Sequence, residues 1–178
     1  MKISHRVLAG SLAAAALGAG VFGSVSASAA PAPAAKAADV RASQTVGTTH
    51  LSVDAAAKGA HAALDAAEKA GQHVTVAVVD RDGNTIVTLR GDGAGPQSYE
   101  SAERKAYTAV SWNAPTSELA KRLAQAPNLK DIPGTLFLAG ATPVTSGSAP
   151  IAAIGVAGAP SGDLDEQFAR AGVAALAK

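Results

Sequence analysis

The chain has 178 residues, with 15 basic and 14 acidic side chains and a formal net charge of +1 at neutral pH. Because the basic and acidic side chains nearly balance, the net charge gives no electrostatic basis for binding nucleic acid. The sequence contains no cysteine, which excludes thiolate catalysis, zinc–thiolate sites, iron–sulfur clusters and cysteine-ligated haem.

The N-terminus has the pattern of a secretory signal peptide. Basic residues within positions 2–6 precede an apolar, Ala-rich run at 7–25, and Ala27-Ser28-Ala29 forms an A-x-A cleavage box. Gly and Ser interrupt the run, which favours a cleaved signal over a transmembrane anchor. The single His5-Arg6 pair leaves both the Sec and the twin-arginine route open. We therefore predict a signal peptide over 1–29, a flexible Ala/Pro-rich tether over 30–46 and one folded domain over 47–178.

The first expected helix begins after Ser52 and ends at Gly71. Ser52 is a suitable N-cap and Asp54 puts a negative charge in the first turn, whereas Gly71 is a typical C-terminal stop. One face of this helix is a stripe of mostly small side chains, which lets the helix lie close to a sheet or to another subunit. The stripe consists of Ala56, Ala60, Ala63, Leu64 and Ala67.

Residues 74–90 predict a central β-hairpin. Two runs rich in β-branched residues flank the tetrad Arg81-Asp82-Gly83-Asn84, and an Asp-Gly step between such runs is a strong hairpin signal. The glycine supplies the positive φ that a tight turn requires. The first run is apolar almost without interruption, so we expect this strand to be buried on both faces.

The second half of the sequence predicts further helices and strands around this hairpin. In a helix over 98–112, Ala102 and Ala106 lie on the expected buried face, and Arg104 and Lys105 on the polar face. The order of elements predicts a single α+β domain with packed helices and a mostly antiparallel, five-stranded sheet. The other helices are expected over 115–125 and from 165 to the C-terminus, and the other strands over 135–139 and 151–156, with room for a short strand in a turn region over 142–150.

Two acidic residues in the helix over 98–112 form the motif Glu100-x-x-Glu103. The i, i+3 spacing places both carboxylates on one helix face, where they can bind a cation such as iron. The alternative is a solvated acidic face that pairs with Arg104 or Lys105, or that complements the helix dipole. The residues alone leave both interpretations open.

His50 and His73 are further candidate metal ligands, because each stands at the end of an expected element. A neutral, exposed imidazole is a suitable ligand for iron, and the alternative for each residue is an ordinary surface histidine. The sequence has no phosphate-binding G-x-x-x-x-G-K-[ST] motif. A Ser-His-Asp triad has no G-x-S-x-G nucleophile elbow to support it.

Segments from both halves of the chain carry a family resemblance. The first half contains VAVVDRDGNTIVTLRGDGAGPQSYESAERKAYTA, and the second contains IPGTLFLAGATPV followed by IAAIGVAGAPSGDLDEQFARAG. In this order they resemble the GlcG/HbpS family, also called haem-degrading or DUF336-like. The resemblance covers roughly residues 50–178. The leader and the tether make the chain most similar to the secreted, haem-binding type within that family.

The resemblance implies a profilin-like fold, assembly into octamers, and binding of haem and iron outside the cell, either free or associated with the cell wall. Similar proteins act with a membrane sensor histidine kinase of a two-component system under redox and iron stress, and some degrade haem. By the same resemblance, Glu100 and Glu103 bind iron, His50 and His73 are secondary iron sites, and Thr135 is an oxygen ligand of haem iron. A hydroxyl is a weak axial ligand, which predicts an exchangeable haem.

Three functions are open on the sequence alone. The first is a secreted haem- and iron-binding accessory of a sensor kinase. The second is a secreted haem-degrading or peroxidase-like enzyme, and the third is a structural oligomer without a ligand. Haem titration separates the third from the others, because it alone predicts no change in the Soret band.

Overall fold

Four antiparallel strands form one sheet in the structure, a computed structural model that describes residues 38–177. The strands are β1 (Thr75–Asp80), β2 (Thr85–Arg90), β3 (Ala141–Ser146) and β4 (Ala149–Ala157), in the order β2-β1-β4-β3. Every neighbouring pair is antiparallel. The α+β class is confirmed, but the described sheet has four strands and the prediction of five is wrong.

The described residues belong to two units, one ending at Thr45 and the other beginning at Val46. In the first unit, the structure describes only residues 38–45, which are exposed and include a short 3-10 turn, η1 (Ala42–Gln44). The predicted signal peptide over 1–29 and the first part of the predicted tether lie outside the described residues. The sheet and the helices around it all belong to the second unit.

The carboxylate of Asp80 holds the turn between β1 and β2. Its Oδ1 accepts hydrogen bonds from the backbone N–H groups of Asp82 (2.9 Å) and Asn84 (2.8 Å). Gly83 has a φ of +88°, which L side chains rarely adopt. The predicted hairpin is confirmed, and so is the burial of β1, which is exposed in part only at its last residue.

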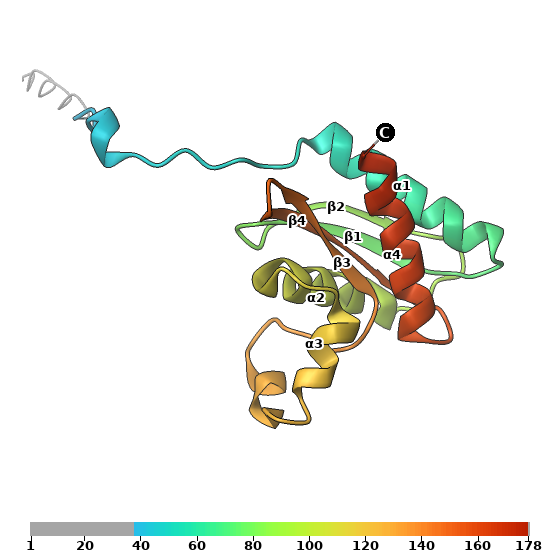
Figure 1. Cartoon of the computed structure of the whole chain (residues 1–178). Helices are drawn as coiled ribbons and strands as arrows, with labels where there is room; N and C mark the ends of the chain where they lie inside the picture. The colour runs from blue at the N-terminus through green and yellow to red at the C-terminus, as the bar shows by residue number, and fades with distance from the viewer. Residues whose placement is uncertain (1–37, 178) are drawn as a thin grey trace, which may run out of the picture. The chain divides into compact units, whose positions relative to one another are not determined.

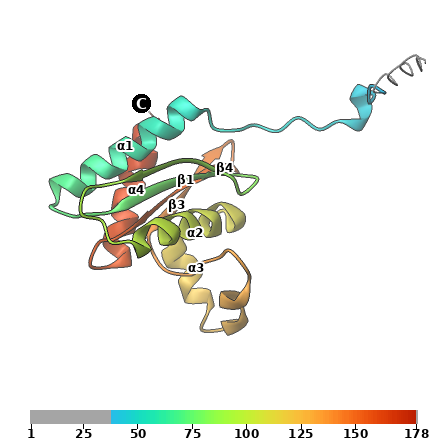
Figure 2. The same cartoon turned by 180° about the vertical axis from the view of Figure 1, so that it is seen from behind.

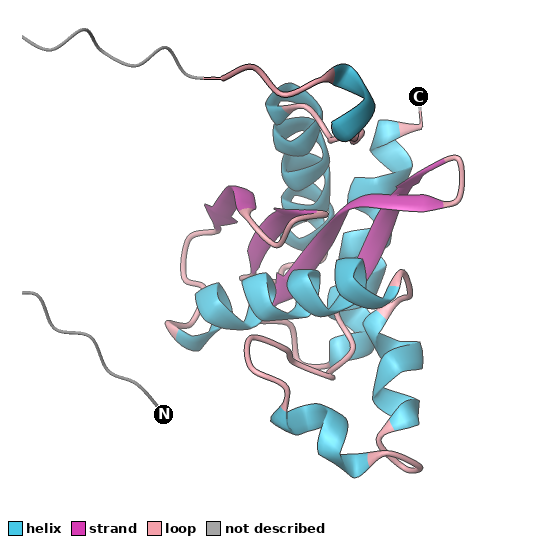
Figure 3. Ribbon diagram, turned by 90° about the vertical axis from the view of Figure 1, so that its left-hand side faces the viewer, coloured by secondary structure: helices cyan, strands magenta, loops and turns pink. Residues whose placement is uncertain are grey.

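Helices cover both faces of the sheet (Figure 1, Figure 2). α1 (Val53–Lys69) and α4 (Gly162–Leu176) pack on one face, and α2 (Gln97–Trp112) packs on the other. The short helix α3 (Thr116–Arg122) and the 3-10 turn η2 (Pro127–Asp131) follow α2. The strands thus lie between helical layers, as Figure 3 shows. No helix within residues 38–177 is long and apolar enough to cross a membrane.

The small-residue stripe of α1 packs inside its own domain. Ser52 caps this helix as predicted, because its hydroxyl accepts a hydrogen bond from the Ala55 N–H (3.3 Å). The stripe faces α4 and the sheet, and Gly59 and Gly172 stand opposite each other between the two helices. Of the two predicted uses of the stripe, contact with a sheet is therefore confirmed. The fully buried members are Ala56, Ala60, Ala63 and Ala67.

Small residues also let α2 lie close to the sheet. Gly155 of β4 stands directly under this helix, and a Cβ atom added there would be 2.7 Å from the backbone nitrogen of Ala106. The residues paired with Gly155 on either side, Ala77 of β1 and Ala141 of β3, are fully buried. The close approach fixes the position of α2, and with it the position of the polar side chains on the outer face of the helix.

The strand predicted over 135–139 is wrong. This segment pairs with no strand of the described sheet, and its backbone bonds to side chains of α2 instead. The Leu136 N–H donates to Thr108 Oγ1 (2.7 Å), and Arg104 Nη2 donates to the Thr135 carbonyl (2.8 Å). The edge strand β3 follows directly, in the region that was predicted as a turn with room for a short strand.

The aromatic side chain of the same segment packs on helices. The Phe137 ring meets the Trp112 ring edge-on, with the ring centroids 5.2 Å apart and the planes at 68°. Leu119 of α3 is fully buried in the same cluster. The apolar run that suggested a strand is therefore buried against α2 and α3, which satisfies its hydrophobic pattern without strand pairing.

Glu166 ties α4 to the start of α3. Its buried carboxylate accepts hydrogen bonds from the Ser117 N–H (2.9 Å), the Ser117 hydroxyl (2.8 Å) and Arg170 Nη2 (2.7 Å). Burial alone would raise the pKa of Glu166, but the hydrogen bonds from Arg170 and Ser117 lower it below its usual value. The ionised carboxylate therefore stabilises the folded state.

We expect Glu166→Gln to lower the free energy of unfolding at neutral pH by about 1–3 kcal/mol, because the amide loses charge-assisted hydrogen bonds. A lowered pKa gives a stabilising contribution that is present above the unfolded-state pKa and is lost as the pH falls through the folded-state pKa. The difference between the two proteins should therefore shrink in acid. Urea unfolding at neutral pH and in acid measures this, with the exposed Glu118→Gln as the control. An equal loss at both pH values would contradict the prediction.

Candidate functional site

The two predicted carboxylates lie on the outer side of α2. Glu100 is largely exposed, and its Oε1 is 3.4 Å from Arg104 Nη1. Glu103 is half-buried and accepts a hydrogen bond from the hydroxyl of Thr88 on β2 (3.2 Å). The carboxylates suit a cation, and the contact of Glu100 with Arg104 is the pairing that the alternative interpretation expected. A cation at this pair has to compete with Arg104 for Glu100.

Lys105 does not lie on the polar face predicted for it. Its side chain runs inward to α4, where Nζ donates to Asp165 Oδ2 (2.8 Å) and to the Val156 carbonyl (3.0 Å). The Lys105 and Asp165 side chains are only 6% and 4% exposed. Burial raises the pKa of Asp165, and the Lys105 ammonium opposes that rise. The pair borders a cavity of about 430 Å³ and links α2 to α4, and it was not predicted from the sequence.

The hydroxyl of Thr135 is buried. The residue is 2% exposed, and Oγ1 donates a hydrogen bond to the Ile132 carbonyl at 2.7 Å. An axial ligand of haem needs a lone pair that the iron can reach. In this conformation Thr135 therefore does not fit the role that the family resemblance implied for it.

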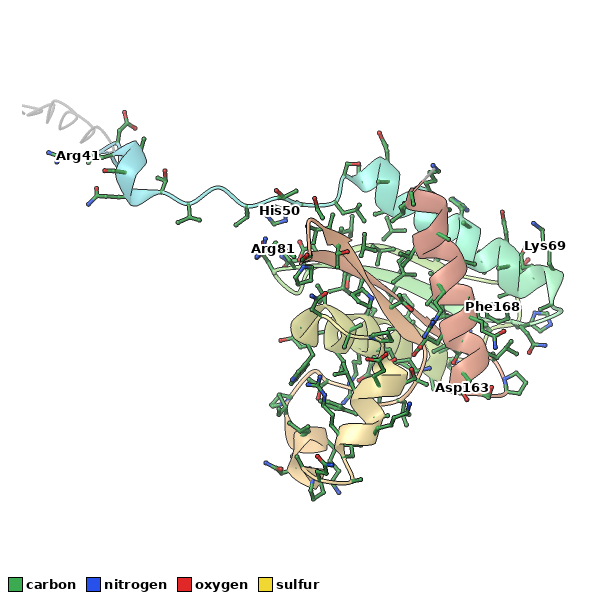
Figure 4. The ribbon with its side chains drawn as sticks, in the orientation of Figure 1. Arg41, His50, Lys69, Arg81, Asp163 and Phe168 are labelled. Carbon is green, nitrogen blue, oxygen red and sulfur yellow. The ribbon has the colours of Figure 1, made fainter. Side chains whose placement is uncertain are left out.

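His50 lies beside the β1–β2 turn, near Arg81 in Figure 4. Its Nε2 is 3.5 Å from Asp82 Oδ2 and 2.7 Å from the Thr48 hydroxyl. With Asp80, these side chains bring three potential donor atoms within 4.8 Å of one another, the one such group of three in the described part of the chain. The two aspartates were not predicted as ligands, although the Asp-x-Asp pattern at a tight turn was a signal for them.

His73 stands at the other end of the hairpin, just before β1. Its Nδ1 is 2.7 Å from the Asp92 carbonyl oxygen, so Nδ1–H donates and Nε2 keeps a free lone pair. In metal-bound histidines, the N–H of the ring nitrogen that does not bind the metal commonly donates to a carbonyl in this way. The ring borders a cavity of about 350 Å³, which Glu68 and Gln72 also line. The geometry of His73 suits a metal ligand.

The candidate ligands do not form one site. The His50 group lies at the β1–β2 turn, Glu103 contacts the middle of β2 through Thr88, and His73 precedes the start of β1. A strand of six residues is about 20 Å long, so the two histidines are far apart along the hairpin. The chain therefore offers three separate sets of candidate metal ligands.

The sequence model of the family described as "Haem degrading protein HbpS-like" matches residues 51–174. The chain therefore belongs to this family, and the resemblance seen in its sequence is confirmed. No curated protein sequence matches the chain at a significant level.

Solved structures of HbpS are similar to this one. A double variant of Streptomyces reticuli HbpS, with two glutamates three positions apart replaced by aspartate, is 74% identical, covers 80% of this chain and 97% of its own, and has a TM-score of 0.79. A second structure of HbpS is 76% identical, covers 77% and 97% of the two chains, and has a TM-score of 0.76. A complex of PduOC with haem is 26% identical, covers 71% and 95%, and has a TM-score of 0.65.

Proposed function

We propose that this chain is an exported, octameric protein that binds haem and iron. It is the haem- and redox-responsive accessory of a membrane sensor histidine kinase in a two-component system. It acts outside the cell, free or associated with the cell wall. Family membership, the high identity to HbpS and the haem complex of PduOC support the haem part of the proposal. The candidate metal ligands His50, Asp80, Asp82 and His73 at the two ends of the hairpin support the iron part.

The observation that carries the iron part is the group formed by His50, Asp80 and Asp82. Imidazole and carboxylate together suit iron. Burial alone would raise the pKa of Asp80, but hydrogen bonds from Asn84 and Asp82 lower it. Asp80 is therefore ionised at neutral pH and can accept a cation without first losing a proton.

Glu100 and Glu103 are the proposed second iron site. Their spacing is the same as that of the two glutamates replaced in the Streptomyces reticuli variant. Iron supplies redox chemistry when it is bound. The chain contributes carboxylate oxygens from one exposed and one half-buried side chain, on a helix that packs closely on the sheet. His73, whose ring the Asp92 carbonyl orients, is the proposed third site.

Iron binding to the full-length protein tests the assignment of iron to Glu100 and Glu103. We expect Glu100→Gln combined with Glu103→Gln to lower the number of ferrous ions bound per chain, because the amides keep the shape of the side chains but lose the charge. The stoichiometry of haem binding and the mass of the assembly by light scattering should stay as in the wild type. Asp65→Asn with Glu118→Gln removes two exposed charges elsewhere and serves as the control. Equal iron binding in all three proteins would make the pair a solvated acidic face.

A second candidate function is a haem-degrading or peroxidase-like enzyme, which the description of the family favours. The two functions differ in turnover. An enzyme given hydrogen peroxide and excess haem bleaches many haems per chain and releases a defined product, whereas a binding protein bleaches at most its bound haem. Haem spectra with product analysis separate these outcomes.

A further inference from the structure

One guanidinium is shared by the carboxylate pair of α2 and the segment that carries Thr135. Arg104 Nη1 lies 3.4 Å from Glu100 Oε1, and Arg104 Nη2 donates to the Thr135 carbonyl at 2.8 Å. The guanidinium is planar and rigid, so its nitrogens move together. A new partner for Glu100 therefore changes the contact that Arg104 makes with Thr135.

Few hydrogen bonds hold the Thr135 segment against α2. Besides the bond from Arg104, the Leu136 N–H donates to the Thr108 hydroxyl oxygen at 2.7 Å. The segment joins no strand and runs beneath α2 (Figure 1, Figure 2). It follows Gly134, whose φ of +78° marks a turn, and Leu138 in it is 57% exposed. The segment can therefore leave α2 without breaking a strand pair, and its opening takes the buried Phe137 ring away from Trp112.

The contact of Arg104 with Glu100 is weak. Its Nε is buried and has no hydrogen-bond partner among the described residues, which is destabilising. The Glu100 side chain is 76% exposed, and an exposed ion pair contributes little to stability. A competitor for Glu100 can therefore displace the guanidinium easily.

We propose that Arg104 is a latch. Its contacts with Glu100 and Thr135 keep the Thr135 hydroxyl buried until a cation binds Glu100 and Glu103. The proposal rests on the proposed function, because it assigns iron to the carboxylates and haem to Thr135. Glu100 and Glu103 would hold the cation, and Glu100 would then no longer be a partner for Arg104, whose guanidinium the added positive charge would repel. Nη2 would leave the Thr135 carbonyl, and the segment would open.

Other charges near Arg104 are already engaged. Glu103 accepts a hydrogen bond from Thr88 on β2, and Lys105 is committed to Asp165 inside the domain. Arg104 is therefore the cation of α2 placed to respond at Glu100. Because binding free energies are linked, iron and haem must then strengthen the binding of each other by the same factor.

Hydrogen exchange tests the latch without haem. In the full-length wild type, we expect the amides of residues 132–138 to exchange faster after ferrous iron is added under anaerobic conditions. Arg104→Gln should show the same fast exchange without iron. Arg122→Gln, which removes an exposed positive charge from α3, should exchange as the wild type does. Unchanged exchange in both the iron-loaded wild type and Arg104→Gln would overturn the latch.

Titration with hemin measures the coupling. Iron should tighten hemin binding to the wild type by about fivefold or more. Arg104→Gln should bind hemin tightly without iron and gain nothing from it. Glu100→Gln keeps the bond from Arg104 to the Thr135 carbonyl but weakens the cation site, so it should bind hemin as the iron-free wild type does and gain less from iron. Weaker binding by Arg104→Gln overturns the proposal, because Arg104 is then an anchor for haem. A wild type that binds neither haem nor iron contradicts the proposed function, whereas one that binds both independently contradicts the latch alone.

Discussion

Lys105→Met is expected to lower the free energy of unfolding by about 3–5 kcal/mol, because it leaves the Asp165 carboxylate buried without its partner. Lys105 Nζ is 2.8 Å from Asp165 Oδ2, and both side chains are almost fully buried. Methionine fills a similar space but carries neither the charge nor the hydrogen bond to the Val156 carbonyl. Chemical unfolding of the wild type and the variant measures the difference.

The loss should be greatest at neutral pH. Burial raises the pKa of Asp165, and removing Lys105 takes away the charge that opposed the rise. Because a protonated Asp165 tolerates burial, the difference should shrink as the pH falls through the raised pKa. Lys105→Met with Asp165→Asn should recover part of the loss, and the exposed Lys121→Met should change little. A small effect of Lys105→Met at neutral pH would show that Asp165 finds another partner or water.

Gly155→Ala is expected to cost about 3 kcal/mol or more, because the added methyl group overpacks the contact between α2 and the sheet. The new Cβ would collide with the backbone carbonyl of Ala102 and stand 2.7 Å from the backbone nitrogen of Ala106. Backbone atoms of a helix cannot rotate away as a flexible side chain can. The whole of α2 therefore has to move, and the carboxylate pair moves with it.

Two controls test this reason for the loss. Gly47→Ala adds the same methyl group where nothing lies within 4 Å, so it should be nearly neutral. Combining Gly155→Ala with Ala106→Gly removes one methyl group but leaves the backbone collision, so it should not restore stability. Full recovery in that double variant would place the strain between side chains instead.

Local patterns predicted the hairpin well and the strand over 135–139 wrongly. Around Gly83 the turn residues and both strands are adjacent in sequence, so the pattern and the structure it forms coincide. In the later segment Thr135 and Phe137 are buried while Leu138 is exposed, which resembles the alternation of a strand. Alternation shows only that one side is buried. It does not show whether a strand or a helix covers that side.

In the candidate site, too, the local patterns were predictable and the long-range contacts were not. The spacing of Glu100 and Glu103 places both on one helix face from the sequence alone. In contrast, His50 meets Asp82 only because the chain before α1 passes the β1–β2 turn, and Lys105 meets Asp165 across 60 positions of sequence. Such long-range pairs have no local signal. Lys105 was assigned to the polar face for that reason.

The edge-on contact between Trp112 and Phe137 gives the chain an optical probe of its own. Trp112 is the single tryptophan, and its partner lies two positions after Thr135. Opening of that segment would separate the rings and admit water to the indole, so the emission maximum would shift to longer wavelength. The motion can therefore be followed in real time by stopped-flow fluorescence on the unlabelled protein.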